Sequence, residues 1–300
     1  MQNLSKLILE KYQVRKTKEQ KTQFIELLQK ELQGYDVRVE QGGMFKSRNI
    51  VVGNLETCDV VLGAHYDTAP ELPFPNFLAP KNILAYLAYT FLIVLAFMAV
   101  MAIGVFVGLL LTDNVVIIML IEYGIMFLLL GCMMFGKANI HTANDNTSGV
   151  ITLIEALHDD NIKDKVCCVF FDHEEVGLFG SSFFANKHKN IMKDKLLINF
   201  DCVSDGDTIM LVVNKNASVL QNKIEESFIS EEDKKFFITK SSTTLYPSDQ
   251  MNFKKNVGVA AFKRNKLIGY YMDRIHTRKD VIFEERNIEM IIKGLKKFVN

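Results

Sequence analysis

The sequence predicts an α/β fold, with a mixed, largely parallel twisted sheet flanked by helices and with two transmembrane helices inserted as a hairpin. Two observations predict it. Short apolar segments that suit buried strands alternate with amphipathic segments that suit helices, before and after one long apolar block. That block runs from residue 82 to 136 and contains only two charged residues, Asp113 and Glu122. A chain of 300 residues is long enough to bury the core of one such domain.

The segment before the apolar block predicts one helix and three strands. Apolar side chains at Phe24, Leu28 and Leu32 repeat at helical spacing and Gly34 follows them, so a helix is expected over residues 17–33. Three β-rich segments follow, over residues 35–40, 49–53 and 58–67. The continuous apolar run in the last of them is typical of a strand that is buried on both faces.

The apolar block contains two segments that are each long enough to cross a membrane. Residues 82–111 and 115–135 are 30 and 21 residues long, and a bilayer core needs roughly 20 helical residues. The turn between them is so short that they must form a hairpin. Four of the five prolines lie within residues 70–80, which predicts an extended tether before the first helix. The expected organisation is a first part of the α/β domain at residues 1–81, the hairpin at 82–136 and the remainder of the domain at 137–300.

Charge and cysteine content place the α/β domain in the cytoplasm. Because a hairpin returns to its starting side, both soluble parts lie on one face of the membrane. Lys81 and Lys137 flank the hairpin, and its turn has no Lys or Arg, so the positive-inside rule puts that face in the cytoplasm. The five cysteines show no paired spacing, which suits reduced thiols in the same compartment. No signal peptide is apparent at the N-terminus.

Helix and strand patterns alternate again after the apolar block. Helices are expected over residues 146–159, 181–189, 217–228 and 284–299. Strands are expected over residues 165–172, 195–201, 208–213 and 257–263. Joined across the hairpin, the two soluble parts make one α/β domain.

Acidic and histidine side chains follow three of the apolar strands. His65, Asp201 and the Asp-His-Glu-Glu group at residues 172–175 each lie at the end of a strand segment. In open α/β sheets, ligands gather at the carboxyl ends of the strands. Asp145 lies where a helix begins, and His276 lies in a polar loop. Histidines mixed with carboxylates, without a thiolate, suit zinc or another borderline divalent ion at an open catalytic site.

Five sequence strings resemble those of a known family. GAHYDT, NDNTSGV, EEVGLFGS, INFD and IHTRKD are similar, in this order, to motifs of metallopeptidase family 28, the co-catalytic di-zinc aminopeptidases, and cover the soluble chain from about residue 58 to 280. EEVGLFGS is distinctive by itself. The resemblance implies a zinc exopeptidase-like fold, two zinc ions or other divalent metals, and hydrolysis of N-terminal residues from peptides.

The resemblance also implies a role for each site residue. The implied metal ligands are Asp145, which would bridge both ions, with His65 and Asp201 on one ion and Glu175 and His276 on the other. Asp67 would orient the imidazole of His65, as metal-bound histidines generally require. Glu174 would be the general base that takes a proton from water.

Two departures from the family pattern concern the substrate and the membrane. Tyr246 and Gln250 are the expected substrate contacts, and Gln250, in SDQMNF, stands where a histidine is common in the family. The hairpin separates His65 from Asp145 by 80 residues, whereas these ligands normally lie much closer. The spanning pair is therefore expected to be an insertion into an otherwise complete catalytic domain.

The leading prediction is a membrane-anchored, cytoplasm-facing zinc aminopeptidase. Its expected partners are peptides, apolar ones in particular because the entrance would lie near the bilayer, and membrane lipid; a formal net charge of zero gives no support for a nucleic-acid partner. One alternative is a glutaminyl cyclase-like enzyme with a single zinc, which the absence of Trp and the GLFGS string disfavour. The other alternative is a non-catalytic membrane scaffold on a peptidase fold.

Overall fold

A nine-stranded mixed sheet forms the centre of the computed structural model, which describes residues 1–300. Its strands are β1 (Val37–Gly42), β2 (Ser47–Val52), β3 (Val60–His65), β4 (Val166–Phe171), β5 (Leu196–Phe200), β6 (Thr208–Val213), β7 (Lys235–Lys240), β8 (Asn256–Asn265) and β9 (Gly269–Tyr271). Their order is β1-β2-β4-β3-β5-β8-β6-β7, and β9 pairs with β8. The four central strands β4, β3, β5 and β8 are parallel to one another.

The predicted fold class is confirmed. Every residue of β3, β4 and β5 is buried, which explains why these strands appear in the sequence as continuous apolar runs rather than alternating ones. Antiparallel pairs extend the parallel centre on both sides, β1 and β2 beyond β4 and β6 beyond β8. The carboxyl ends of β4, β3 and β5 therefore lie next to one another at one edge of the sheet.

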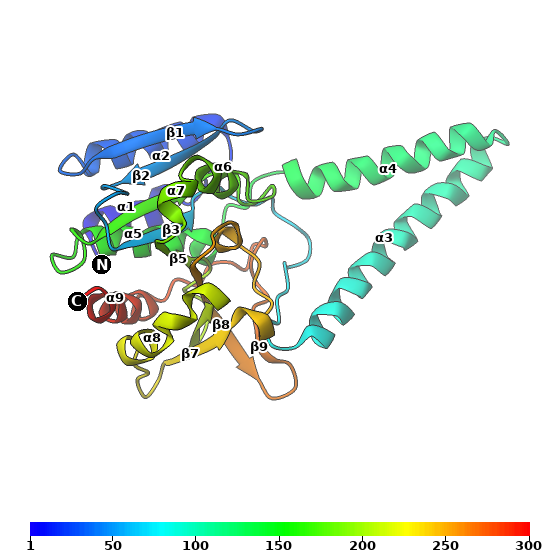
Figure 1. The fold of residues 1–300 in the computed structure, drawn as a ribbon. Helices are drawn as coiled ribbons and strands as arrows, with labels where there is room; N and C mark the ends of the chain where they lie inside the picture. Colours follow the sequence, from blue (N-terminus) through cyan, green and yellow to red (C-terminus); the bar gives the residue numbers. More distant parts are fainter.

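Helices cover both faces of the sheet (Figure 1). The domain helices are α1 (Asn3–Lys11), α2 (Lys18–Glu31), α5 (Gly149–Leu157), α6 (Phe179–Lys187), α7 (Lys189–Met192), α8 (Gln221–Ser227) and α9 (Glu285–Val299). Residues of α1, α2, α5, α8 and α9 contribute to a core cluster of 41 buried residues, whereas α6 and α7 contribute to a smaller one of 11. Short helical turns occur at Ala143–Ser148, Lys215–Leu220, Ser241–Thr243 and Asp249–Asn252. The larger core lies on the α5 side and holds the helix that follows Asp145.

Most predicted elements are present, and four short elements were missed. Helix α2 begins at a capping box between Thr17 and Gln20 and buries Phe24 and Leu28, as its apolar spacing predicts. The missed elements are α1, α7, β7 and β9. Strand β7 is only partly buried and β9 has three residues, so neither produces a strong apolar pattern.

Two long helices project from the domain and meet at their far ends (Figure 1). They are α3 (Ile83–Leu111) and α4 (Val115–Phe135), close to the predicted bounds. Both are long and apolar enough to cross a membrane, and only 11% and 6% of their most apolar windows are buried. Gly104 and Gly108 of α3 face Ile125 and Ile118 of α4, which lets the helices approach closely near the turn. Toward the domain the helices diverge.

The proline-rich segment before α3 is extended, as predicted, and is fastened to the domain. The amide of Leu72 donates to the carbonyl of His276 at 2.8 Å, and Leu78 forms an isolated bridge with Met272. The first turns of α3 also contact the domain, since the hydroxyl of Tyr89 donates to the carbonyl of Pro75 at 2.7 Å. The start of α3 is therefore packed on the extended segment that is joined to the α/β domain.

Candidate active site

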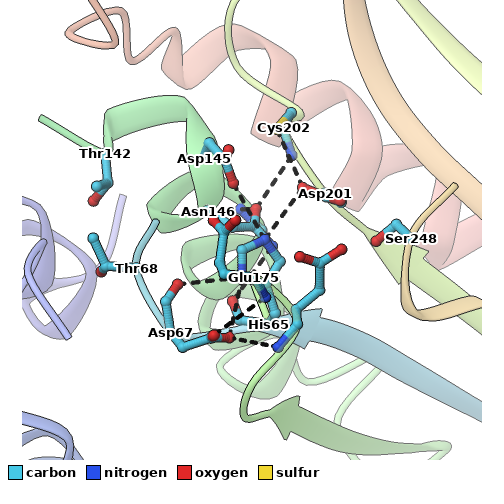
Figure 2. A network of polar contacts seen from close by, with 12 residues as sticks. His65, Asp67, Thr68, Thr142, Asp145, Asn146, Glu175, Asp201, Cys202 and Ser248 are labelled. Carbon is cyan, nitrogen blue, oxygen red and sulfur yellow. Dashed lines mark hydrogen bonds and ion pairs between the residues drawn. The ribbon is translucent and has the colours of Figure 1, made fainter. Parts of the chain in front are cut away.

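The structure brings all five predicted metal ligands together at the carboxyl edge of the sheet. His65 is the last residue of β3, and Asp201 directly follows β5. Glu175 lies in the loop after β4, and His276 lies in the loop between β9 and α9. Asp145 lies in the turn before α5, where its dihedral angles and those of its neighbour are not helical. Figure 2 shows four of these side chains pointing toward one another.

Asp145 lies between the two histidines. Its Oδ1 is 3.2 Å from Nε2 of His65, and its Oδ2 is 3.2 Å from Nε2 of His276. Asp201 Oδ1 lies 3.5 Å from Nε2 of His65, whereas Glu175 Oε2 lies 3.2 Å from Nε2 of His276. The ligand atoms of His65, Asp145 and Asp201 form one group, and those of Asp145, Glu175 and His276 form a second group that shares Asp145. A third group joins His65 with Glu174 and Glu175, and in each group all the atoms lie within 4.8 Å of one another.

The buried ionisable groups at this site shift one another's pKa values. Burial would lower the pKa of His65, but the carboxylates around it, Glu174 first, raise that pKa well above its ordinary value. The pKa of His276 is raised in the same way against the effect of burial, chiefly by Glu175. Burial is also the main cause of the raised pKa of Glu174 and of Glu175. A site with this many buried carboxylates attracts cations.

The donor set fits divalent metal ions. Oε1 of Glu175 is buried without a hydrogen-bond partner, and leaving such an atom unpaired in a protein interior costs free energy. Imidazole and carboxylate are ligands that zinc accepts, and two of the groups share Asp145. The residues that would hold the ions are those of these two groups.

A family comparison agrees with this geometry. Residues 130–292 match the sequence profile of Peptidase family M28, a match that covers more than half of the chain. The chain belongs to this peptidase family. The matched region contains four of the five candidate ligands, whereas His65 lies on the other side of the long helices. The resemblance inferred from the sequence strings is therefore confirmed.

Solved structures with the same fold include peptidases and cyclases. The aminopeptidase LapA of Legionella pneumophila is 13% identical, with a TM-score of 0.57 over 99% of this chain and 69% of that one. A Zn-dependent exopeptidase from Parabacteroides distasonis is 13% identical, with a TM-score of 0.57 over 99% of this chain and 94% of that one. The glutaminyl cyclase of Porphyromonas gingivalis is also 13% identical, with a TM-score of 0.62 over 99% of this chain and 96% of that one. At this identity the likeness shows the fold alone. No curated protein matches the sequence significantly.

Asp67 holds both His65 and the glutamate pair of this peptidase. Its carboxylate is 3.5 Å and its carbonyl oxygen 3.2 Å from Nδ1 of His65. The same carboxylate accepts hydrogen bonds from the backbone amides of Glu174 at 3.0 Å and Glu175 at 3.3 Å. Burial opposes the charged form of Asp67, but His65 and Lys21 keep its pKa well below the ordinary value. One carboxylate therefore fixes the positions of a candidate ligand and of the candidate base.

Two further residues position the ligands and were not predicted from the sequence. The side-chain nitrogen of Asn146 donates to the carbonyl of Phe200 at 3.0 Å, and its side-chain oxygen accepts from the backbone amide of Cys202 at 3.2 Å. Asn146 therefore binds the backbone on both sides of Asp201. The carboxylate of Asp280 accepts from the backbone amide of Asp145 at 2.9 Å. Both contacts join residues more than fifty positions apart, which no local pattern reveals.

Tyr246 reaches the candidate active site and Gln250 does not. The hydroxyl of Tyr246 donates to the carbonyl of Asp201 at 2.8 Å, and the ring lines the same cavity as the ligands. Gln250 is buried behind it: its amide nitrogen donates to the carbonyl of Tyr246 and its oxygen accepts from Asn199. The protein itself occupies both polar atoms of the Gln250 side chain, and the substrate contact expected of this residue stays a prediction.

A cavity of about 230 Å³ opens over the candidate ligands. Its polar wall includes Glu174, whose carboxylate forms neither a hydrogen bond nor an ion pair with the protein. Its apolar wall is built partly from the extended segment and from α3, which contribute Leu78 and Tyr86. Helix α3 therefore forms part of the wall of the cavity over the candidate ligands, through Tyr86.

A second, apolar cavity of about 320 Å³ lies at the base of the two long helices. It is lined by α3, by α4 and by Leu72, Pro73 and Phe74 of the extended segment. The same segment contributes Leu78 to the candidate active site and bonds to the carbonyl of His276 through Leu72. The extended segment thus contacts both the apolar cavity between α3 and α4 and the loop that carries His276.

Proposed function

We propose that the chain is a membrane-anchored, zinc-dependent aminopeptidase whose catalytic domain faces the cytoplasm. The observation that carries the proposal is the placement of Asp145, whose two carboxylate oxygens each face a different histidine at 3.2 Å. Such a carboxylate suits a bridge between two ions. Two zinc ions held there would supply Lewis acidity toward the scissile carbonyl and the attacking water.

The chain's own residues can perform the remaining chemistry. Glu174 has a carboxylate that lines the cavity without a protein partner, and its backbone is fixed by Asp67, so it is placed to take a proton from water and return it to the leaving amine. The surrounding carboxylates favour a substrate with a free ammonium group. Since the cavity is small, we infer that it accepts the N-terminal residue of a peptide rather than an internal segment.

Apolar peptides near a membrane are the proposed substrates. Two helices long and apolar enough to span the bilayer leave the domain beside the candidate active site, and the apolar cavity at their base adjoins the same extended segment. Lys81 and Lys137 flank the helices, whereas their turn is free of Lys and Arg, which supports a cytoplasmic catalytic domain.

Glutaminyl cyclase activity is the second candidate, because a glutaminyl cyclase shares the fold over 96% of its length. Two ligand groups that share Asp145, rather than a single group, favour the peptidase. A non-catalytic scaffold is disfavoured because the five candidate ligands and the candidate base all converge on one cavity.

Three peptides distinguish these functions. We expect the purified, zinc-loaded chain to release the N-terminal residue of an apolar peptide with a free amine, and to cleave the acetylated copy of that peptide at least about a hundredfold more slowly, since acetylation removes the charge that the carboxylates bind. A third peptide with N-terminal glutamine should lose glutamine rather than cyclise, as measured by mass spectrometry. Pyroglutamate formation would establish the cyclase instead, and equal cleavage of blocked and free peptides would contradict aminopeptidase action.

The orientation of the hairpin is tested by labelling. A tag in the turn at Asp113 should react with a membrane-impermeant reagent on intact cells, whereas a tag at Asn300 should react only after lysis. The two tags lie on opposite sides of the bilayer in the proposed topology. Labelling of the C-terminal tag on intact cells would reverse the orientation.

A further inference from the structure

A basic cavity of about 290 Å³ lies beside the loop that carries the candidate base. It is formed where the start of α2, the start of β2 and the end of β4 meet. One of its lysines, Lys21, forms a buried ion pair with Asp172. The other cationic side chains that line it form no ion pair: Lys16, Lys18, Lys46 and Arg48. Because the whole chain has a formal net charge of zero, this is a local concentration of positive charge.

The turn that closes the cavity exposes apolar side chains. Met44 and Phe45, between β1 and β2, are 84% and 40% exposed. The ring of Phe45 packs against Phe179 with ring centroids 4.4 Å apart, so the turn is held in place beside the cavity. The backbone amides of Met44 and Phe45 form no hydrogen bond. An exposed apolar tip next to unpaired cations is typical of a surface that contacts lipid headgroups.

This turn lies at the same end of the domain as the bases of the two long helices. β2 is antiparallel to β4 and pairs Ile50 with Phe170, so the start of β2 lies at the carboxyl end of β4. The segment that leads to α3 leaves from the carboxyl end of β3, the parallel neighbour of β4. In Figure 1 the β1–β2 turn and the base of α4 lie at the same side of the domain. A bilayer that surrounds α3 and α4 therefore faces this turn.

We propose that the basic cavity binds the phosphate of an anionic phospholipid headgroup while Met44 and Phe45 enter the interface. The inference rests on the proposed membrane insertion of α3 and α4. Four uncompensated cations match an anionic headgroup in charge, and the apolar tip matches the acyl region beneath it. This second attachment fixes the orientation of the catalytic domain, so that the cavity over the candidate ligands remains close to the bilayer surface.

Hydrogen exchange of the full-length chain in nanodiscs tests this site. Amides of Met44 and Phe45 should exchange about tenfold more slowly in nanodiscs that contain phosphatidylglycerol than in phosphatidylcholine nanodiscs. The double variant Lys16→Gln/Lys46→Gln should reduce that difference roughly tenfold, because it removes two of the four cations. The matched control is Lys193→Gln/Lys254→Gln, which removes the same charge from the amino ends of β5 and β8 and should behave as the unmodified chain.

Four other results would contradict the proposal that the basic cavity binds a phospholipid headgroup. Equal exchange in both nanodiscs means that no anionic lipid binds at the turn. Slower exchange in phosphatidylcholine nanodiscs after addition of inorganic phosphate, without dependence on lipid, assigns the cavity to free phosphate. A change in KM for a peptide acid but not its amide, confined to the Lys16→Gln/Lys46→Gln variant, assigns it to the substrate carboxylate. A chain that enters neither nanodisc contradicts membrane anchoring itself, whereas aminopeptidase activity in solution would still stand.

Discussion

Replacing Glu174 by glutamine should lower kcat by about two to four orders of magnitude, the range expected for loss of a general base, while the bound metal is retained. The carboxylate of Glu174 lines the cavity and forms no hydrogen bond or ion pair with the protein, so its removal leaves no structural partner unsatisfied. The amide group of glutamine is similar in size but cannot accept a proton at neutral pH. The measurement is kcat with a free-amine peptide, together with metal content by elemental analysis.

The neighbouring residue provides the matched control. Glu175→Gln changes the same functional group one position along the chain, but Glu175 contacts His276 at 3.2 Å and belongs to a ligand group. This variant should therefore lose one metal ion. If Glu174→Gln loses metal and Glu175→Gln keeps it, the two roles are reversed. If neither affects activity, proton transfer does not depend on this pair.

The positions of the ligands on strands could be predicted because the end of a buried parallel strand is visible in the sequence, where its apolar run stops. β3 and β5 are fully buried, so their sequences carry apolar runs up to the point where the strand ends, and the polar residue at that point is easy to identify: His65 at the end of β3 and Asp201 directly after β5. Adjacent parallel strands end at one edge, which brings His65 and Asp201 together without any knowledge of the loops. His276 lies in an irregular loop instead, and only its resemblance to the family motif indicated its role.

The supporting contacts could not be predicted, because they join distant backbone groups. Asn146 and Asp280 appear as ordinary polar loop residues until the fold places carbonyls and amides of other segments beside them. Hydropathy also could not show that Tyr86 faces the cavity, since an apolar side chain that faces lipid and one that faces the domain look alike in sequence. The place of Gln250 in the SDQMNF segment also could not show that its amide nitrogen donates to the carbonyl of Tyr246.

Asp145→Ala should abolish binding of both metal ions and with it all peptidase activity. A bridging carboxylate belongs to both sites, and each oxygen of Asp145 faces a different histidine. Its removal would leave one histidine and one carboxylate in each of the two groups that share it, fewer than the three protein ligands that catalytic zinc sites usually have. The stoichiometry of zinc in the purified variant, compared with two ions per unmodified chain, is the decisive measurement.

The variant Asp201→Asn is the control that distinguishes loss of a bridging ligand in Asp145→Ala from general disruption of the site. Asp201 belongs to the group with His65 and not to the group with His276, so this variant should lose one ion and retain the other. Circular dichroism should show that both variants remain folded, since β3 and β5 are held by backbone pairing and by a large core away from the site. An unmodified, active chain with a single tightly bound ion would exclude the bridge and favour cyclase-like chemistry. One ion lost from Asp145→Ala and both lost from Asp201→Asn would instead make Asp201 the shared ligand.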